Sequence, residues 1–273
     1  MKQDAKNFPL GVFDSGLGGL TALNALKKVL PHEDILYLGD TGRVPYGVRS
    51  RQTILKYTQQ DVDFLMQKGV KAILCACGTV SAVALPLLKQ DLPIPICGVL
   101  EFAVDAALRH TKTGKIGIIG TQATIQSGAY EALLRKKRTD LLLTSRACPL
   151  LVPLVENGRT RPGDVVIETI VEEYLAPMKA ANVDTLILGC THYPLLEAVI
   201  ANYLGAGVTL ISAGKEAANA MVTDLAQKNL LRDETELGKK QYFVTDSVRG
   251  FVALASEFLE ENIEGEVEKV TLF

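Results

Sequence analysis

Short apolar runs alternate with segments of helical periodicity along nearly the whole of this 273-residue chain. Runs typical of buried strands occupy residues 10–13, 35–38, 94–99, 115–121, 141–145 and 241–245. Helical patterns occupy residues 20–29, 50–68, 127–138, 163–181 and 250–259. Because strands that are connected through helices run parallel in a sheet, this order predicts an α/β fold of parallel sheets covered by helices.

Two further apolar runs share one pattern, and each ends in a cysteine. Residues 70–77 end in Cys77 and residues 183–190 end in Cys190, with a valine seven residues before the cysteine in both runs. Small or polar residues and then a helical pattern follow each cysteine. Each thiol is therefore predicted at the carboxyl end of a strand, which is the edge of a parallel sheet where ligands bind.

The chain repeats its pattern on a larger scale. Residues 11–15 resemble residues 117–121, and each segment lies upstream of one cysteine run. We therefore expect two similar α/β halves that face each other across a cleft, with one thiol on each side. Such a site suits chemistry that reaches a substrate from two opposite faces. The segment from residue 208 onward contains more strand and helix, but the pattern does not assign it to either half.

Composition excludes several functional classes. The net charge of −2 leaves no basic excess to hold a nucleic-acid backbone, and no apolar stretch reaches the ~18 residues of a membrane span. The N-terminal residues lack the apolar core of a signal peptide. Five cysteines do not form an even disulfide framework, and Cys75, Cys97 and Cys148 are expected to fill the core. We expect a cytoplasmic protein without a nucleic-acid or membrane partner.

A glycine-rich turn, DSGLGGLT at residues 14–21, follows the first predicted strand and opens a helix. It lacks the glycine spacing of dinucleotide-binding and Walker loops, so no nucleotide cofactor is expected. Its backbone N–H groups are suited to a small anion, with Asp14 and Ser15 at the ligand edge of the sheet. The alternative is a tight turn in which Asp14 caps the helix.

A second polar loop, residues 39–47, follows the next predicted strand. Tyr46 and Gly47 offer a hydroxyl group and an approachable backbone N–H to a ligand. An ordinary surface loop is the alternative interpretation.

The cysteine loops also carry Thr79, Thr191 and His192, and the thiols are open to three chemistries. Zinc is disfavoured because Cys75-x-Cys77 has no second ligand pair nearby in the sequence. A disulfide relay requires the fold to bring together two cysteines that are far apart in the chain. Proton transfer accounts best for the polar neighbours: a thiolate removes a proton from carbon while a thiol opposite delivers another, which inverts the centre.

With these residues the chain resembles the glutamate racemases, cofactor-independent enzymes that supply D-glutamate for peptidoglycan. The resemblance covers about residues 10–260. It rests on residues 13–21 (FDSGLGGLT), 37–41 with 45–47, Ala76-Cys77 with Thr79, 120–121 with 124–125, 152–156 (VPLVE) and 188–196 (LGCTHYPLL).

The resemblance implies two α/β domains related by a pseudo-twofold axis, with the active site in the cleft between them. The first comprises residues 1–98 and 208–273, and the second residues 99–207. It implies that Cys77 and Cys190 are the catalytic acid–base groups, with Asp14 beside the first and Glu156 and His192 beside the second. The implied glutamate contacts are Asp14, Ser15, Tyr46, Gly47, Gly78, Thr79, Thr121, Thr191 and His192. No metal or other cofactor is implied.

Some positions depart from the family pattern. The family usually has Asn between the first Cys and Thr, where this chain has Gly78, so an amide contact with the substrate is lost. Further departures lie at Glu101-Phe102-Ala103, Gln122-Ala123 and Ile211-Ser212-Ala213-Gly214. None of them removes a thiol. The role of the matching carboxylate Asp40 stays open.

Other functions also stay open. They are a racemase of aspartate or another acidic amino acid, a related two-cysteine isomerase, a non-catalytic carboxylate-binding relative, and a dithiol redox protein. A homodimer is compatible with the sequence, which does not specify the oligomeric state.

Overall fold

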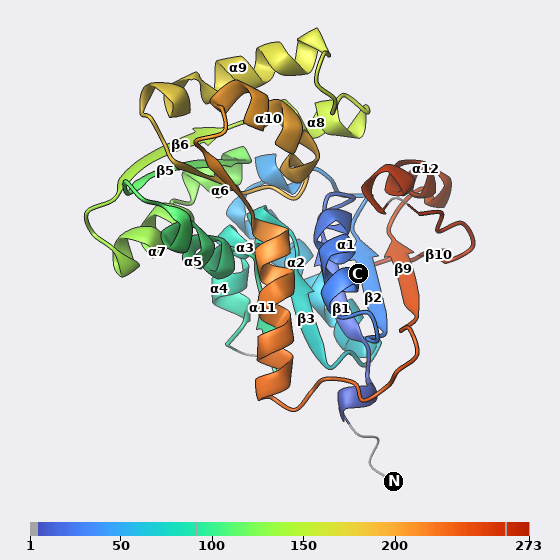
Figure 1. Ribbon diagram of the computed structural model, residues 1–273. Coiled ribbons are helices and arrows are strands. Elements are labelled where there is room, and N and C mark those ends of the chain that lie inside the picture. The colour runs from blue at the N-terminus through green and yellow to red at the C-terminus, as the bar shows by residue number, and fades with distance from the viewer. Residues whose placement is uncertain (1–4, 91, 260, 273) are drawn as a thin grey trace.

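The computed structural model describes residues 5–90, 92–259 and 261–272 and contains two parallel sheets (Figure 1). The first has the strand order β10-β9-β2-β1-β3-β4 and the second the order β6-β5-β7-β8. The strands are β1 (Leu10–Asp14), β2 (Ile35–Gly39), β3 (Ala72–Cys75), β4 (Ile96–Cys97), β5 (Lys115–Gly120), β6 (Leu142–Ala147), β7 (Thr185–Leu188), β8 (Thr209–Ser212), β9 (Lys240–Val244) and β10 (Val267–Lys269). The predicted fold of two parallel-sheet α/β domains is confirmed.

Helices cover the faces of both sheets, which is why the central strands β1 and β7 are buried along their whole length. The helices are α1 (Leu20–Val29), α2 (Arg51–Gln67), α3 (Gly78–Val83), α4 (Leu85–Leu88), α5 (Leu100–His110), α6 (Gln122–Gln126), α7 (Ala129–Lys137), α8 (Leu151–Glu156), α9 (Val165–Ala180), α10 (Glu197–Leu204), α11 (Ala213–Gln227) and α12 (Val248–Leu259), with short 3-10 helices η1 (Ala5–Asn7), η2 (Tyr46–Val48) and η3 (Tyr193–Leu196). Of the described helices, none has the length and hydropathy required to cross a bilayer.

The two halves repeat one topology. In each, the first strand lies between the second and third strands, and the fourth extends the sheet beyond the third: β2-β1-β3-β4 corresponds to β6-β5-β7-β8. Cys77 lies two residues after β3 and Cys190 two residues after β7. Both thiols therefore lie at the carboxyl edge of equivalent strands, as the sequence predicted.

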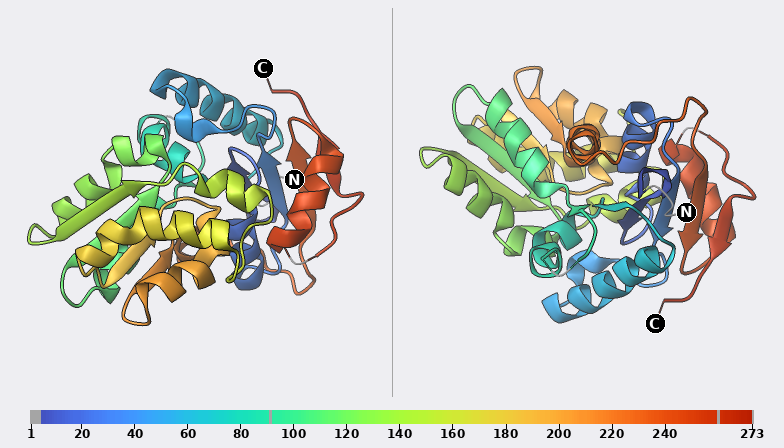
Figure 2. Two further views of the ribbon diagram at one scale, coloured as in Figure 1. Left: turned by 90° about the horizontal axis from the view of Figure 1, so that it is seen from above. Right: turned by 90° about the horizontal axis from the view of Figure 1, so that it is seen from below.

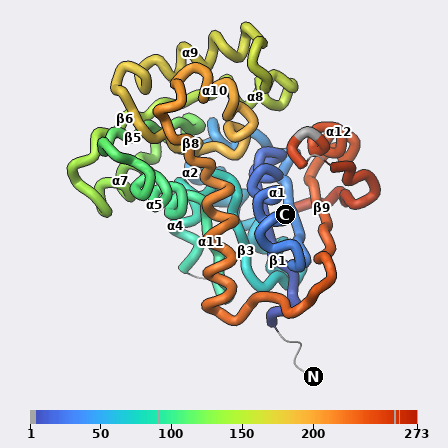
Figure 3. Tube along the Cα trace, in the orientation of Figure 1, coloured from blue at the N-terminus to red at the C-terminus, as the bar shows by residue number. Residues whose placement is uncertain are grey.

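Helix α11 connects the halves. It packs against α1 of the first half and α5 of the second, and in the ribbon it runs between them (Figure 1). Seen from above and below, the second sheet with its helices lies on one side and the first sheet with α12 on the other (Figure 2). After α11 the chain returns to the first sheet to form β9 (Figure 3).

The domain boundary predicted at residue 208 falls too early. Strand β8 pairs with β7, with Leu210 opposite Leu186, and so belongs to the second sheet. Thr209 is exposed, Leu210 and Ser212 are partly buried and only Ile211 is fully buried, so this short strand gives too weak an apolar pattern to be recognised in the sequence. The predicted strand 94–99 is likewise reduced to the two residues of β4.

Candidate active site

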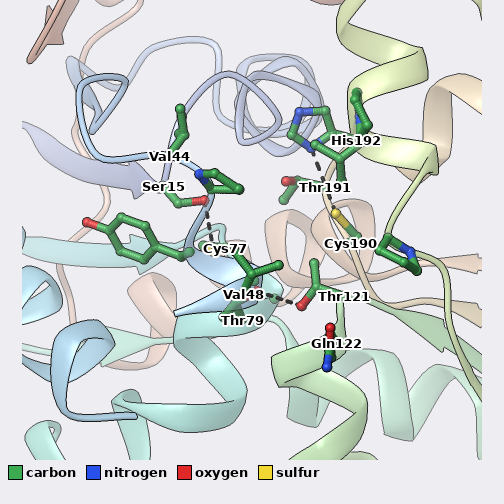
Figure 4. A pocket seen from close by; sticks show the side chains of 18 of the residues that line it. Ser15, Val44, Val48, Cys77, Thr79, Thr121, Gln122, Cys190, Thr191 and His192 are labelled. Atoms are coloured by element: carbon green, nitrogen blue, oxygen red, sulfur yellow. Dashed lines mark hydrogen bonds between the residues drawn. The ribbon is translucent and has the colours of Figure 1, made fainter. Parts of the chain in front are cut away.

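A cavity of about 320 Å³ opens at the carboxyl edges of the two sheets and is lined by residues of both halves (Figure 4). This volume is at the lower end of the range for small-molecule sites. Eleven of the predicted site residues line it: Ser15, Tyr46, Gly47, Cys77, Gly78, Thr79, Thr121, Glu156, Cys190, Thr191 and His192. Asp14, the remaining predicted residue, lies directly behind this wall.

Cys77 comes from the first half and occupies the N-cap position of α3. Its thiol is buried and donates a hydrogen bond to Ser15 Oγ at 3.4 Å. Burial, together with the nearby negative charge of Asp14, raises the pKa of Cys77 to about 12. Cys77 is therefore a neutral thiol that holds its proton at neutral pH.

Cys190 comes from the second half and has a different partner. His192 Nδ1 lies 3.8 Å from Cys190 Sγ, and His192 Nε2 lies 3.0 Å from Glu156 Oε1. Burial disfavours the charged imidazole, but the hydrogen bonds to Cys190 and Glu156 outweigh it and raise the pKa of His192 to about 10. Figure 4 shows His192 beside Cys190 and Ser15 beside Cys77. An imidazolium thus faces the second thiol at neutral pH, so the two walls of the cavity differ electrostatically.

Asp14 connects the two halves behind the cavity. Its carboxyl group accepts the Gly16 N–H at 2.9 Å and the Thr191 hydroxyl of the second half at 3.3 Å. Burial raises the pKa of Asp14 despite the positive charge of His192 and these hydrogen bonds. Asp14 does not cap α1, whose N-cap is Gly19.

Further hydroxyl contacts hold the halves together around the cavity. Thr79 Oγ1 of α3 lies 2.9 Å from Thr121 Oγ1, which also caps α6. The Thr21 hydroxyl of α1 donates to Thr191 O at 2.8 Å. The cavity is therefore bounded by direct bonds between the first and second halves.

The backbone of Gly78 lies close to the backbone of the second half. A Cβ added at this position would lie 2.2 Å from Gly189 O, which is far inside van der Waals contact. Asn, the usual residue of the family that the chain resembles, therefore has no room in this arrangement. The departure noted in the sequence lets the chain segments that carry the two cysteines come together.

The position of Tyr46 differs from the prediction in one respect. It lines the cavity, but its hydroxyl group is hydrogen-bonded to the buried carboxyl groups of Asp40 and Asp61. The hydroxyl therefore does not face a ligand. Gly47 packs closely on the second half: a Cβ added at Gly47 would lie only 2.7 Å from Thr121 Cβ.

Several lining residues were not assigned from the sequence. They are the mostly apolar residues Gly16, Val44, Pro45, Val48, Gln122, Pro149, Val152 and Pro153. Half of them lie in loops, where hydrophobic periodicity carries no signal. Among the described residues, no group of three or more His, Cys, Asp or Glu side chains is placed to hold a metal ion.

Comparisons with known proteins agree with this geometry. Residues 22–221 match the family model described as Asp/Glu/Hydantoin racemase. A glutamate racemase of Aquifex aeolicus is 45% identical over 94% of this chain and 96% of its own length. The crystal structure of the glutamate racemase isoform RacE1 from Bacillus anthracis superposes with a TM-score of 0.92 at 42% identity and covers 98% of each chain. A glutamate racemase from Francisella tularensis, solved in complex with D-glutamate, superposes with a TM-score of 0.90 at 36% identity and covers 97% of this chain and 98% of its own.

Proposed function

This chain belongs to the Asp/Glu/Hydantoin racemase family of isomerases, and we propose that it interconverts L- and D-glutamate. The observation that carries the proposal is the placement of two thiols, one from each half, in the wall of a single small cavity. The substrate assignment is supported by the glutamate racemases that match nearly the full chain. It is also supported by the D-glutamate in the Francisella tularensis structure.

The mechanism follows from the difference between the two thiols. Cys77 holds a proton, whereas Cys190 faces the imidazolium of His192, which stabilises negative charge on sulfur. In one direction Cys190 removes the Cα proton from one face of glutamate, and Cys77 delivers its proton to the opposite face. One C–H bond breaks and one forms, and the enzyme is left with the reverse protonation of its two sulfurs. The other direction uses the same groups in reverse.

The neighbouring groups have separate roles in this proposal. Glu156 orients His192 through the imidazole Nε2, and Asp14 sets the negative potential behind Cys77. Ser15, Thr79, Thr121 and Thr191 supply hydroxyl groups close to the thiols, where hydrogen bonds to the substrate carboxylates stabilise the carbanion that forms after proton removal. Closure around the cavity excludes water and strengthens these bonds.

The role of the reaction is assigned by resemblance. We propose that the product D-glutamate enters peptidoglycan synthesis and that the reaction takes place in the cytoplasm, without pyridoxal phosphate or a metal ion. The free amino acid is the partner that this small cavity accommodates. A homodimer stays compatible with the sequence.

The test is circular dichroism of L-glutamate, D-glutamate and L-aspartate solutions incubated with the purified protein. We expect both glutamate enantiomers to lose ellipticity and L-aspartate to keep it. Cys77→Ser and Cys190→Ser should each lose at least about a hundredfold in kcat, because each removes one acid–base group. Cys97→Ser serves as the control, since that thiol lies outside the cavity.

Three outcomes contradict the proposal, and each points to an alternative. Aspartate turnover that exceeds glutamate turnover assigns a different substrate. Glutamate binding without racemisation identifies a non-catalytic relative. Full activity of either cysteine variant refutes the two-thiol mechanism.

A further inference from the structure

A cluster of buried polar side chains lies behind the cavity-lining segment formed by residues 44–48. The Tyr46 hydroxyl lies between two carboxyl groups: it is hydrogen-bonded to Asp40 Oδ2, and Asp61 Oδ2 is 3.1 Å away. Asp40 follows β2, whereas Asp61 belongs to α2, and both side chains are fully buried. The cluster therefore ties the cavity-lining segment to two other parts of the first half.

The single proton of the phenol limits the protonation states that the two carboxyl groups can adopt. A tyrosine hydroxyl has a single proton, so it can donate to only one of the two carboxyl oxygens. If both carboxyl groups were ionised, the second oxygen would face the lone pairs of the phenol without a proton between them. One of the two carboxyl groups must therefore carry a proton and donate it to the Tyr46 oxygen.

The remaining contacts show which carboxyl group this is. Asp40 also accepts from Arg43 Nε at 2.5 Å and from the Thr245 hydroxyl at 2.8 Å. Every bond that Asp40 receives thus suits an ionised acceptor, and the positive charge of Arg43 lies beside it. Asp61 has one other bond to the cluster, from Arg43 Nη2 to its Oδ1 at 3.1 Å, which leaves Oδ2 free to carry the proton.

The charges around Asp61 favour the same assignment. The groups that face it are the carboxylates Asp40 and Asp14, the cation Arg43 and the phenol of Tyr46. Burial and the negative charge of Asp40 raise the pKa of Asp61 well above its usual range, against the opposing effect of Arg43.

We propose that Asp61 is a neutral carboxylic acid that donates a hydrogen bond to Tyr46, and that this bond positions the cavity-lining segment 44–48. The effect reaches the cavity through Gly47, whose backbone packs on Thr121 of the second half. Thr121 in turn contacts Thr79 beside the first thiol. Asp61 is thus a positioning residue, and its link to turnover rests on the proposed function.

The proton assignment is tested by the pH dependence of unfolding, which needs no turnover. In the unfolded chain Asp61 ionises near the ordinary carboxyl pKa, so above that pH the folded state binds one more proton than the unfolded state. Because the folded state binds this extra proton, the folding equilibrium constant falls by up to tenfold for each unit that the pH rises. The fall ends at the pH where Asp61 of the folded state also ionises. Asp61→Asn imitates the neutral acid, because its amide group can donate to Tyr46 and its oxygen can accept from Arg43.

Urea unfolding is therefore measured between roughly pH 5 and 7 for the wild type, Asp61→Asn, Asp63→Asn and Asp40→Asn. We expect Asp61→Asn to be more stable than the wild type at pH 7. We also expect its free energy of unfolding to lose the fall with rising pH that the Asp61 proton causes in the wild type. Asp63→Asn, on the exposed side of the same helix, should keep the wild-type slope. An unchanged slope in Asp61→Asn, or a loss of stability as large as in Asp40→Asn, would overturn the proton assignment.

The positioning role is tested by racemisation kinetics of the wild type, Asp61→Asn and Tyr46→Phe. Asp61→Asn should keep kcat/KM within about threefold of the wild type, whereas Tyr46→Phe should lose at least about tenfold, because a segment of the cavity wall is released. If the slope disappears in Asp61→Asn but Tyr46→Phe keeps full kcat/KM, the positioning role is wrong although the proton assignment holds. If the wild type racemises nothing, the proposed function fails and the unfolding result still decides the proton assignment.

Discussion

Substitution of Gly78 gives the sharpest structural prediction, because resemblance and geometry predict opposite outcomes. By resemblance, Gly78→Asn restores an amide that contacts the substrate and should raise affinity. In the structure the new Cβ would lie 2.2 Å from Gly189 O. Gly189 N donates to Ile119 O at 2.8 Å, so this backbone is held within the second half and cannot rotate away.

The size of the effect follows from where these two glycines lie. An ordinary carbon–oxygen contact requires the two backbones to separate by about 1 Å. Gly78 follows Cys77 and Gly189 precedes Cys190, so the separation moves the two thiols apart across the substrate. A misplacement of this size costs about a hundredfold in rate. We expect Gly78→Ala and Gly78→Asn both to lose one to two orders of magnitude in kcat/KM for L-glutamate, followed by circular dichroism.

Gly207→Ala is the matched control, because an added Cβ meets no atom within 4 Å there. It should keep wild-type kinetics. Urea unfolding of the Gly78 variants separates a displaced cleft from a protein that no longer folds. If Gly78→Asn equals or exceeds the wild type in kcat/KM, the contact with Gly189 does not limit closure and this reasoning is refuted.

Three further substitutions test other parts of the structure. The imidazolium of His192 stabilises the folded state fully below the ordinary histidine pKa, and this stability is lost as the pH rises toward a pKa of about 10. Glu156→Gln should therefore weaken the pH dependence of the free energy of unfolding in urea. An unaltered pH dependence would argue against the ion pair. Lys71→Met leaves the buried carboxylate of Glu33 without its cation and should cost about 3–5 kcal/mol of unfolding free energy. A loss below about 1 kcal/mol would show that water reaches Glu33. Thr79→Val removes the hydroxyl bond to the second half. It should raise the KM for glutamate about tenfold with little change in the free energy of unfolding. An unchanged KM would contradict the role of Thr79 in closing the cavity.

The sequence specified the strands and thiols well because their signals are local. The apolar runs before Cys77 and Cys190 mark buried strands, and the small residues after them mark the turn into the next element. Weak local signals explain the errors. Strand β8 is short and partly exposed, and its membership of the second sheet depends on pairing with β7, which no local pattern reveals.

Side-chain direction was the least predictable part of the site. Tyr46 was predicted to offer its hydroxyl to a ligand, but that group bonds to Asp40 and Asp61 because they lie buried beside it. Asp61 lies within the predicted helix, where an acidic residue normally faces solvent. Its burial depends on Arg43 and Tyr46 from a loop that packs against the helix, and this tertiary contact left no pattern in the sequence.

Incubation of the protein with L-glutamate in D₂O shows whether two thiols on opposite faces exchange the Cα hydrogen with solvent. Mass spectrometry of the separated enantiomers at early times gives the deuterium content at Cα of product and remaining substrate. With two thiols on opposite faces, D-glutamate should form with one solvent deuteron at Cα, while the remaining L-glutamate stays largely unlabelled. No D-isomer, or D-glutamate that retains the original Cα hydrogen, would contradict the account.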